Sequence, residues 1–236
     1  MNKLSLTLPE NRTLIFYLLL SAALLLSRLP LIGRYFRVVS TMIHEAAHVF
    51  ATLLVSGQLI SINLFSDTSG STVTKSKGKF SQFIIAVAGY PLTALTGFLL
   101  MYLLVNQNAM YILFVLLSIV MILMVLSIRN SYGLFWAATF ALINILLVYF
   151  DNHIAIWIAA AFFTLIIVTD SLVSTIVLLA ISYKNQKKAG DATNLHKITG
   201  VPAIIWALIF VAFSGFMVYL SVVKYFPSVK GLFQNL

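Results

Sequence analysis

The chain of 236 residues is 61% hydrophobic and only 9% charged, and its mean hydropathy is +1.02. Soluble domains are roughly 45–50% apolar and about 25% charged, and a soluble chain of this length has too little interior to bury so much apolar side chain. The composition therefore excludes an ordinary soluble protein and indicates a chain surrounded by lipid.

The formal net charge of +9 does not lead us to expect a nucleic-acid partner. The basic residues cluster in short polar gaps between apolar runs, which is typical of cytoplasmic loops that face anionic lipid. The sequence has no cysteine, so it can form no disulfide and offers no thiolate. Any metal ion must therefore be held by histidine, aspartate, glutamate or water.

Seven apolar runs reach or approach the length of about 20 residues that a membrane-spanning helix needs. The first is short unless it extends to Ile32. We expect an all-α polytopic membrane protein with about six to seven transmembrane helices, forming a single domain over residues 1–236. The runs cover residues 13–27, 38–56, 80–105, 110–128, 132–150, 154–183 and 201–223.

The segment 58–79, directly after the second run, has a different character. Apolar and polar residues partly alternate on both sides of Asp67-Thr68-Ser69-Gly70, which predicts a small β-hairpin whose turn is served by Asp67. Two roles are open for this hairpin. Its strand edge could pair with an extended peptide substrate, or it could be an ordinary loop with no substrate role.

The lysines and arginines in the short loops predict the orientation of the chain in the membrane. The loops after the third and fifth runs have no Lys or Arg, so the even-numbered loops and the N-terminus are predicted to face the cytoplasm. Three arginines disagree, because they fall in the first loop, on the other side; the number and orientation of the N-terminal spans therefore stay open. The even loops contain Lys75, Lys77, Lys79, Arg129, Lys184, Lys187, Lys188 and Lys197, and the first loop contains Arg28, Arg34 and Arg37.

The second run contains the pentapeptide His44-Glu45-Ala46-Ala47-His48. Residues four apart lie on one face of a helix, so His44 and His48 can present two imidazoles to one metal ion. Glu45 lies about 100° round the helix from His44, where it can take a proton from metal-bound water; this is the HExxH arrangement of zinc peptidases. A charged residue at bilayer depth costs about 2.5–3.5 kcal/mol. This cost favours a metal site over the alternative, a polar cluster that packs helices together.

A catalytic zinc site needs a third protein ligand, and Asp170 is the leading candidate. It lies near the middle of the run 154–183 with no basic neighbour in the sequence, so an ionised Asp170 needs a cation from elsewhere. The alternative is a protonated Asp170 that forms a hydrogen bond between helices. The rival is Asp191, which lies in a polar loop before the last run, where capping of a helix N-terminus would also explain an aspartate.

These residues resemble the site-2 protease family of intramembrane zinc metalloproteases, in particular its compact bacterial branch. The resemblance depends on the pentapeptide at 44–48, the segments 56–62 and 69–72, Ala88-Gly89-Tyr90-Pro91, and the segment 190–202. It implies a Zn²⁺ cofactor, a membrane protein substrate and a multi-pass location in the bacterial plasma membrane. The wider family takes its third ligand from a Leu-Asp-Gly motif; this chain has none, and Asp170 in Thr169-Asp170-Ser171 is the closest counterpart.

The sequence is thus interpreted as an intramembrane zinc metalloendopeptidase. It would hydrolyse a peptide bond of a membrane-associated protein, with Glu45 as the general base and His44, His48 and Asp170 as metal ligands. Two other functions are open: a non-catalytic metal-binding membrane protein and a small transporter. A transporter predicts broken helices repeated in two halves of the chain, and the sequence shows no such repeat. Substrate-binding residues and the oligomeric state are not indicated.

Overall fold

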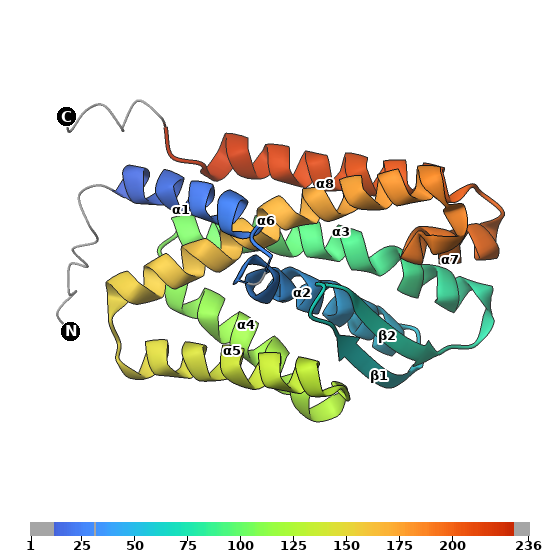
Figure 1. Ribbon diagram of the computed structural model, residues 1–236, viewed down its shortest axis with the longest axis horizontal. Coiled ribbons are helices and arrows are strands. Elements are labelled where there is room, and N and C mark those ends of the chain that lie inside the picture. Colours follow the sequence, from blue (N-terminus) through green and yellow to red (C-terminus); the bar gives the residue numbers. More distant parts are fainter. Residues whose placement is uncertain (1–11, 31, 229–236) are drawn as a thin grey trace.

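The computed structural model describes residues 12–30 and 32–228. Helices dominate, and one short antiparallel hairpin follows the second helix (Figure 1). The all-α polytopic fold with a small hairpin is therefore confirmed. The elements are α1 (Arg12–Leu26), α2 (Ile32–Leu54), β1 (Gln58–Leu64), β2 (Gly70–Lys75), α3 (Gly78–Val105), α4 (Ala109–Leu126), α5 (Ser131–Tyr149), α6 (His153–Lys184), the 3-10 turn η1 (Gln186–Lys188), α7 (Gly190–Thr199) and α8 (Ala203–Tyr225).

Five of the seven predicted runs form helices that are long and apolar enough to cross a membrane, namely α3, α4, α5, α6 and α8. Many large apolar side chains on them face outward, including Phe135, Ile122 and Phe216. In water this exposed apolar surface would be unfavourable, whereas lipid solvates it. With only 15 residues, α1 is shorter than a span, and the 23 residues of α2 include Arg34, Arg37, Glu45 and both histidines of the pentapeptide.

The first two helices differ from the sequence expectation, which placed a loop on the far side of the membrane between them. Tyr17 near the start of α1 donates a hydrogen bond to the carbonyl of Pro227, just beyond the end of α8. Arg37 near the start of α2 lies against Asp170 in the middle of α6. The turn between α1 and α2 therefore lies part-way along the molecule, and the two helices run in the same direction (Figure 1).

This geometry explains the three arginines that disagreed with the predicted orientation. They follow a helix that begins at the end of the molecule opposite to α7 and stops half-way, so they do not mark a loop on the outer side. The start of α1 also lies at the opposite end from the lysine-bearing loops (Figure 1). The predicted placement of the chain start falls on residues 1–11, which lie outside the described residues.

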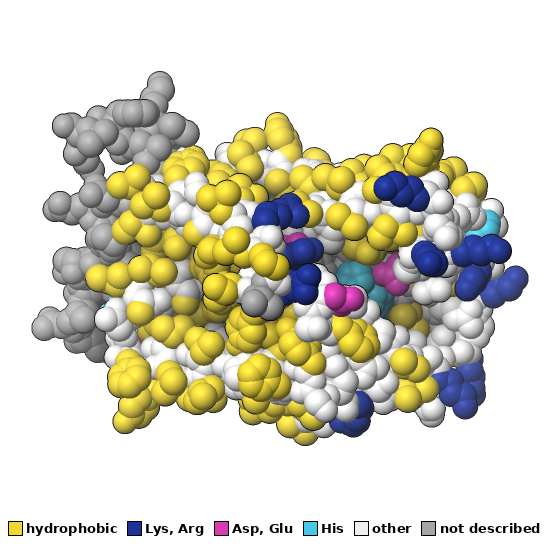
Figure 2. All heavy atoms as spheres, viewed as in Figure 1, with side chains coloured by type: hydrophobic (Ala, Val, Ile, Leu, Met, Phe, Trp, Pro, Cys, Tyr) yellow, Lys and Arg dark blue, Asp and Glu magenta, His cyan; other side chains and the backbone are white. Residues whose placement is uncertain are grey.

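Lysines gather at one end of the molecule. Since α3, α4, α5 and α6 run antiparallel in sequence, the loops after α2, α4 and α6 all lie at the same end (Figure 1). Figure 2 shows dark-blue side chains grouped at that end. The shared position of these loops agrees with the expectation that they face one side of the membrane, and the cytoplasmic side remains a prediction.

The hairpin packs firmly on the helices through one face. Ile62 and Leu64 of β1 are fully buried, and the backbone of Ile62 pairs with the α4–α5 connection through Ser127 and Arg129. β2 pairs with β1 only, in the register Ile62↔Thr72 and Leu64↔Gly70. The core thus holds β1 in place, and β1 in turn positions β2 beside α2 (Figure 1).

Candidate metal centre

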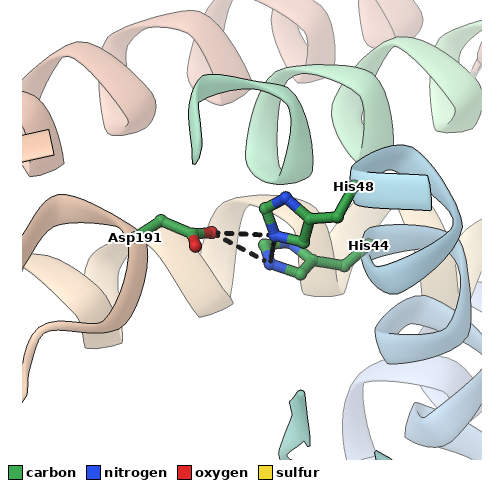
Figure 3. Close-up of side chains that lie close together, drawn as sticks. All are labelled: His44, His48 and Asp191. Carbon is green, nitrogen blue, oxygen red and sulfur yellow. Dashed lines mark hydrogen bonds and ion pairs between the residues drawn. The ribbon is translucent and has the colours of Figure 1, made fainter. Parts of the chain in front are cut away.

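Three side chains from two distant parts of the sequence converge on one point (Figure 3). His44 and His48 extend from the same face of α2, and Asp191 approaches from α7. The Nε2 atoms of the two histidines lie 3.1 Å apart. Each Nε2 atom lies 3.2 Å from Oδ2 of Asp191.

These separations suit a bound metal ion. Zinc binds imidazole nitrogen and carboxylate oxygen at about 2.0–2.1 Å in a tetrahedral arrangement, so two of its ligand atoms lie about 3.3 Å apart. All three distances in the cluster are close to that value. Two imidazoles and one carboxylate form a common zinc donor set, and three protein ligands leave the fourth position free for water or substrate. The residues therefore fit the ion that the sequence implies.

The surroundings also orient the ligands. Nδ1 of His48 lies 2.8 Å from the carbonyl oxygen of Ile85 in α3. A carbonyl can only accept, so Nδ1 carries the proton and donates it, which leaves the Nε2 lone pair directed at the metal position. Burial of Asp191 would raise the pKa of its carboxyl, but protonated His48 and His44 outweigh burial and lower that pKa well below its ordinary value. The ionised carboxylate is the form that binds a metal ion, which would displace the proton from each Nε2.

Asp191 reaches the site because the segment after α6 folds into a short helix. Gly190 begins α7 with φ +47°, and the hydroxyl of Thr193 accepts a hydrogen bond from the Ala189 amide and donates one to the Gln186 carbonyl. The sequence predicted a polar loop here, because α7 has few apolar residues. The buried positions Ala192 and Leu195 nevertheless pack α7 onto its neighbours, so Asp191 faces the histidines.

The backbone of α3 approaches the two imidazoles closely at Gly89. A Cβ atom at this position would lie 2.7 Å from each histidine Nε2. The ring of Tyr90 packs edge-on against His44, with centroids 4.5 Å apart. The segment Ala88-Gly89-Tyr90-Pro91 lies inside the uninterrupted helix α3. Its glycine makes room for the metal ligands.

The cluster opens into a cavity of about 840 Å³ that Glu45 also lines. Figure 2 shows histidine and acidic side chains through an opening in the surface. Hydroxyl groups are frequent in the walls, from Ser40, Ser71, Thr74, Thr93 and Ser174 among others. Glu45 is 4% exposed, and its Oε2 accepts a hydrogen bond from Thr72 Oγ1 at 2.5 Å.

Asp170, the expected third ligand, lies elsewhere in the same cavity. Its Oδ1 accepts a hydrogen bond from Nε of Arg37 at 2.8 Å, so the pair forms an ion pair between α2 and α6. The structure thus supplies Asp170 with a cation from α2, and it brings the rival Asp191 to the imidazoles. The sequence did not predict this ion pair, because Arg37 and Asp170 are 133 positions apart.

Two other polar residues lie away from the cluster. His196 lies within α7, and its Nδ1 is 3.0 Å from the carbonyl oxygen of Val201. Asp67 accepts hydrogen bonds from the amide and hydroxyl of Ser69, and these bonds lower the pKa of its carboxyl. Asp67 therefore serves the hairpin turn, as predicted.

A family model described as Peptidase M50B-like matches residues 16–221, which include every residue of the metal cluster and Glu45. No curated protein and no solved structure matches the chain. The match covers most of the sequence, and the five apolar helices agree with a multi-pass membrane protease. The chain therefore belongs to the Peptidase M50B-like family.

Proposed function

We propose that the protein is an intramembrane zinc metallopeptidase that hydrolyses a peptide bond of a membrane-associated protein, in a bacterial plasma membrane. The observation that carries this proposal is the convergence of three ligand atoms, each about 3 Å from the others, in a cavity that also contains Glu45. Membership in a peptidase family supports the reaction class.

His44, His48 and Asp191 would hold the ion, which replaces Asp170 by Asp191 in the ligand set expected from the sequence. A bound zinc ion supplies a Lewis acid that polarises the scissile carbonyl and lowers the pKa of a water molecule. Glu45 takes the proton from that water and later delivers it to the leaving amine. This role is supported by the cavity, which Glu45 lines together with the three ligands.

The cavity suits an unwound peptide. A substrate helix must lose backbone hydrogen bonds before its carbonyl can be attacked, and groups in the walls can satisfy the freed backbone. The hydroxyl-rich lining offers such groups. In the part of the chain that the structure describes, the outer edge of β2 has no strand partner, and β2 residues line the cavity. An extended substrate could add to this edge.

Substitution of Glu45 by Gln tests the proposal. The amide cannot accept the proton of water, so cleavage should fall by about 10²–10⁴-fold, whereas both imidazoles and Asp191 remain and zinc should stay bound. Purified wild-type and variant proteins would be compared on a library of internally quenched peptides and on single-span membrane peptides in proteoliposomes.

Equal cleavage by wild type and Glu45→Gln would contradict catalysis by this site. Zinc bound by a wild type that cleaves no member of either set would instead favour a metal-binding membrane protein without peptidase activity.

A further inference from the structure

The hairpin is joined to α2 by two threonine hydroxyls. Thr41 Oγ1 donates a hydrogen bond to the Thr68 carbonyl at 2.7 Å, and Thr72 Oγ1 donates one to Oε2 of Glu45 at 2.5 Å. Because Thr41 and Glu45 are four residues apart, both contacts lie on one face of α2. The first joins two structural groups, whereas the second ends on the carboxylate to which we assign the general-base role.

Thr72 holds a carboxylate that has little other support. Across residues 12–30 and 32–228, Thr72 is the one residue found donating a hydrogen bond to Glu45, and no cationic side chain pairs with it. The other oxygen, Oε1, lies against Gly70, where any Cβ would collide with it. The two oxygens of Glu45 therefore differ: one is bonded to the hairpin, and the other lies beside a residue without a side chain.

The core fixes the position of Thr72. Thr72 is the register partner of Ile62, which is fully buried. The amide of Ile62 donates to the Ser127 carbonyl at 2.8 Å, and its carbonyl accepts from the Arg129 amide at 3.1 Å. A hydroxyl anchored in this way can hold a carboxylate at a constant angle, whereas a hydroxyl on a mobile loop could not.

We propose that Thr72 is a positioning residue for Glu45: its hydroxyl binds Oε2 and so directs Oε1 toward the water that must lose its proton. The inference rests on the proposed function. A hydrogen bond to an ionised carboxylate is short and strong, and a catalytic group displaced by about 1 Å can lose about 10²-fold in rate. The Thr72 hydroxyl is given no contact with substrate or metal, and it acts through Glu45 alone.

Three hydroxyl variants separate positioning from a loss of hairpin structure. Thr72→Val keeps the shape and removes the donor, and Thr72→Ser restores the donor. Thr41→Val removes the other hydroxyl that joins the same hairpin to the same helix. The readouts are bound zinc, kcat and KM on one quenched peptide that the wild type cleaves, and the infrared carboxylate band that disappears in Glu45→Gln.

We expect Thr72→Val to lower kcat by about 10- to 100-fold with KM changed by less than about twofold and zinc retained. Thr72→Ser should recover most of the rate, and Thr41→Val should lose less than about threefold. The Glu45 band should shift in Thr72→Val and not in Thr41→Val.

An unchanged kcat in Thr72→Val would overturn the proposal, as would an equal loss in Thr41→Val or no recovery with Ser. The infrared band distinguishes failure of the positioning role of Thr72 from failure of the proposed peptidase function. A shifted band in a protein that cleaves nothing would support positioning while contradicting the peptidase function, and an unshifted band would contradict positioning itself.

Discussion

Gly89 shows how one missing side chain makes the metal centre possible. Its Cα faces the two imidazoles so closely that a Cβ would lie within 2.7 Å of both Nε2 atoms, and these nitrogens cannot move away without leaving the metal position. The α3 backbone that carries Gly89 cannot move away either, because the packed interior holds it in place.

Gly89→Ala should therefore remove bound zinc while leaving the chain folded. The matched control is Gly215→Ala in α8, where the added Cβ meets only Leu172 at 3.9 Å, an ordinary contact. Zinc analysis of the two purified variants checks the prediction. Full zinc occupancy in Gly89→Ala would show that the centre does not lie where the imidazoles and α3 meet.

At this scale the sequence predicts part of the site and not the rest. His44, Glu45 and His48 are recognisable because their spacing on one helix fixes their relative positions. The sequence names Asp191 only as the rival third ligand, because its distance to α2 depends on how α7 packs, and a ten-residue helix with few apolar residues gives a weak periodic signal. Thr72 and Gly70 are missed for a similar reason, since only the docked hairpin brings them to Glu45.

The ion pair between Arg37 and Asp170 connects two helices, α2 and α6, beside the cavity. The side chains of Arg37 and Asp170 are 23% and 9% exposed, so either charge left alone would be poorly solvated. Arg37 lies on the same face of α2 as His44, two turns closer to the start of the helix. The pair thus ties α2 to α6 beside the cavity.

Asp170→Ala should lower the free energy of unfolding by about 3 kcal/mol, because it leaves a partly buried guanidinium unpaired. The double variant Arg37→Met with Asp170→Leu should regain much of that loss, since neither charge then remains. Thermal unfolding in detergent measures both. If the double variant is no more stable than Asp170→Ala, the loss does not come from the unpaired charge.

The first two helices mark the limit of prediction at the scale of elements. The apolar runs predicted the positions of α3 to α6 and α8 well, because a span needs a long apolar stretch whatever it packs against. The path of α1 and α2 could not be predicted in this way. Their direction depends on contacts with distant residues, such as Tyr17 with Pro227 and Arg37 with Asp170.

For the whole molecule, the lysine-bearing loops are predicted to face the cytoplasm and the loop between α3 and α4 the opposite side. The chain lacks cysteine, so single cysteines can be introduced and labelled without background. Lys187 in η1 and Asn106 after α3 are both exposed and lie at opposite ends of the molecule.

Lys187→Cys should react with a membrane-impermeant maleimide only in inverted vesicles, and Asn106→Cys only in right-side-out cells. Both cysteines should react after detergent is added, which controls for exposure. Labelling of Lys187→Cys in intact cells would reverse the predicted orientation. Labelling of both from one side would contradict three spans, α4, α5 and α6, between the two positions.

We propose that His44, His48 and Asp191 hold one zinc ion and that Asp170 does not. The zinc content of purified Asp191→Asn and Asp170→Asn distinguishes the two aspartates, because each substitution removes one negative charge and conserves volume. We expect about one zinc per chain in wild type and in Asp170→Asn, and a loss of affinity of at least about tenfold in Asp191→Asn. Zinc retained by Asp191→Asn and lost from Asp170→Asn would overturn this ligand set.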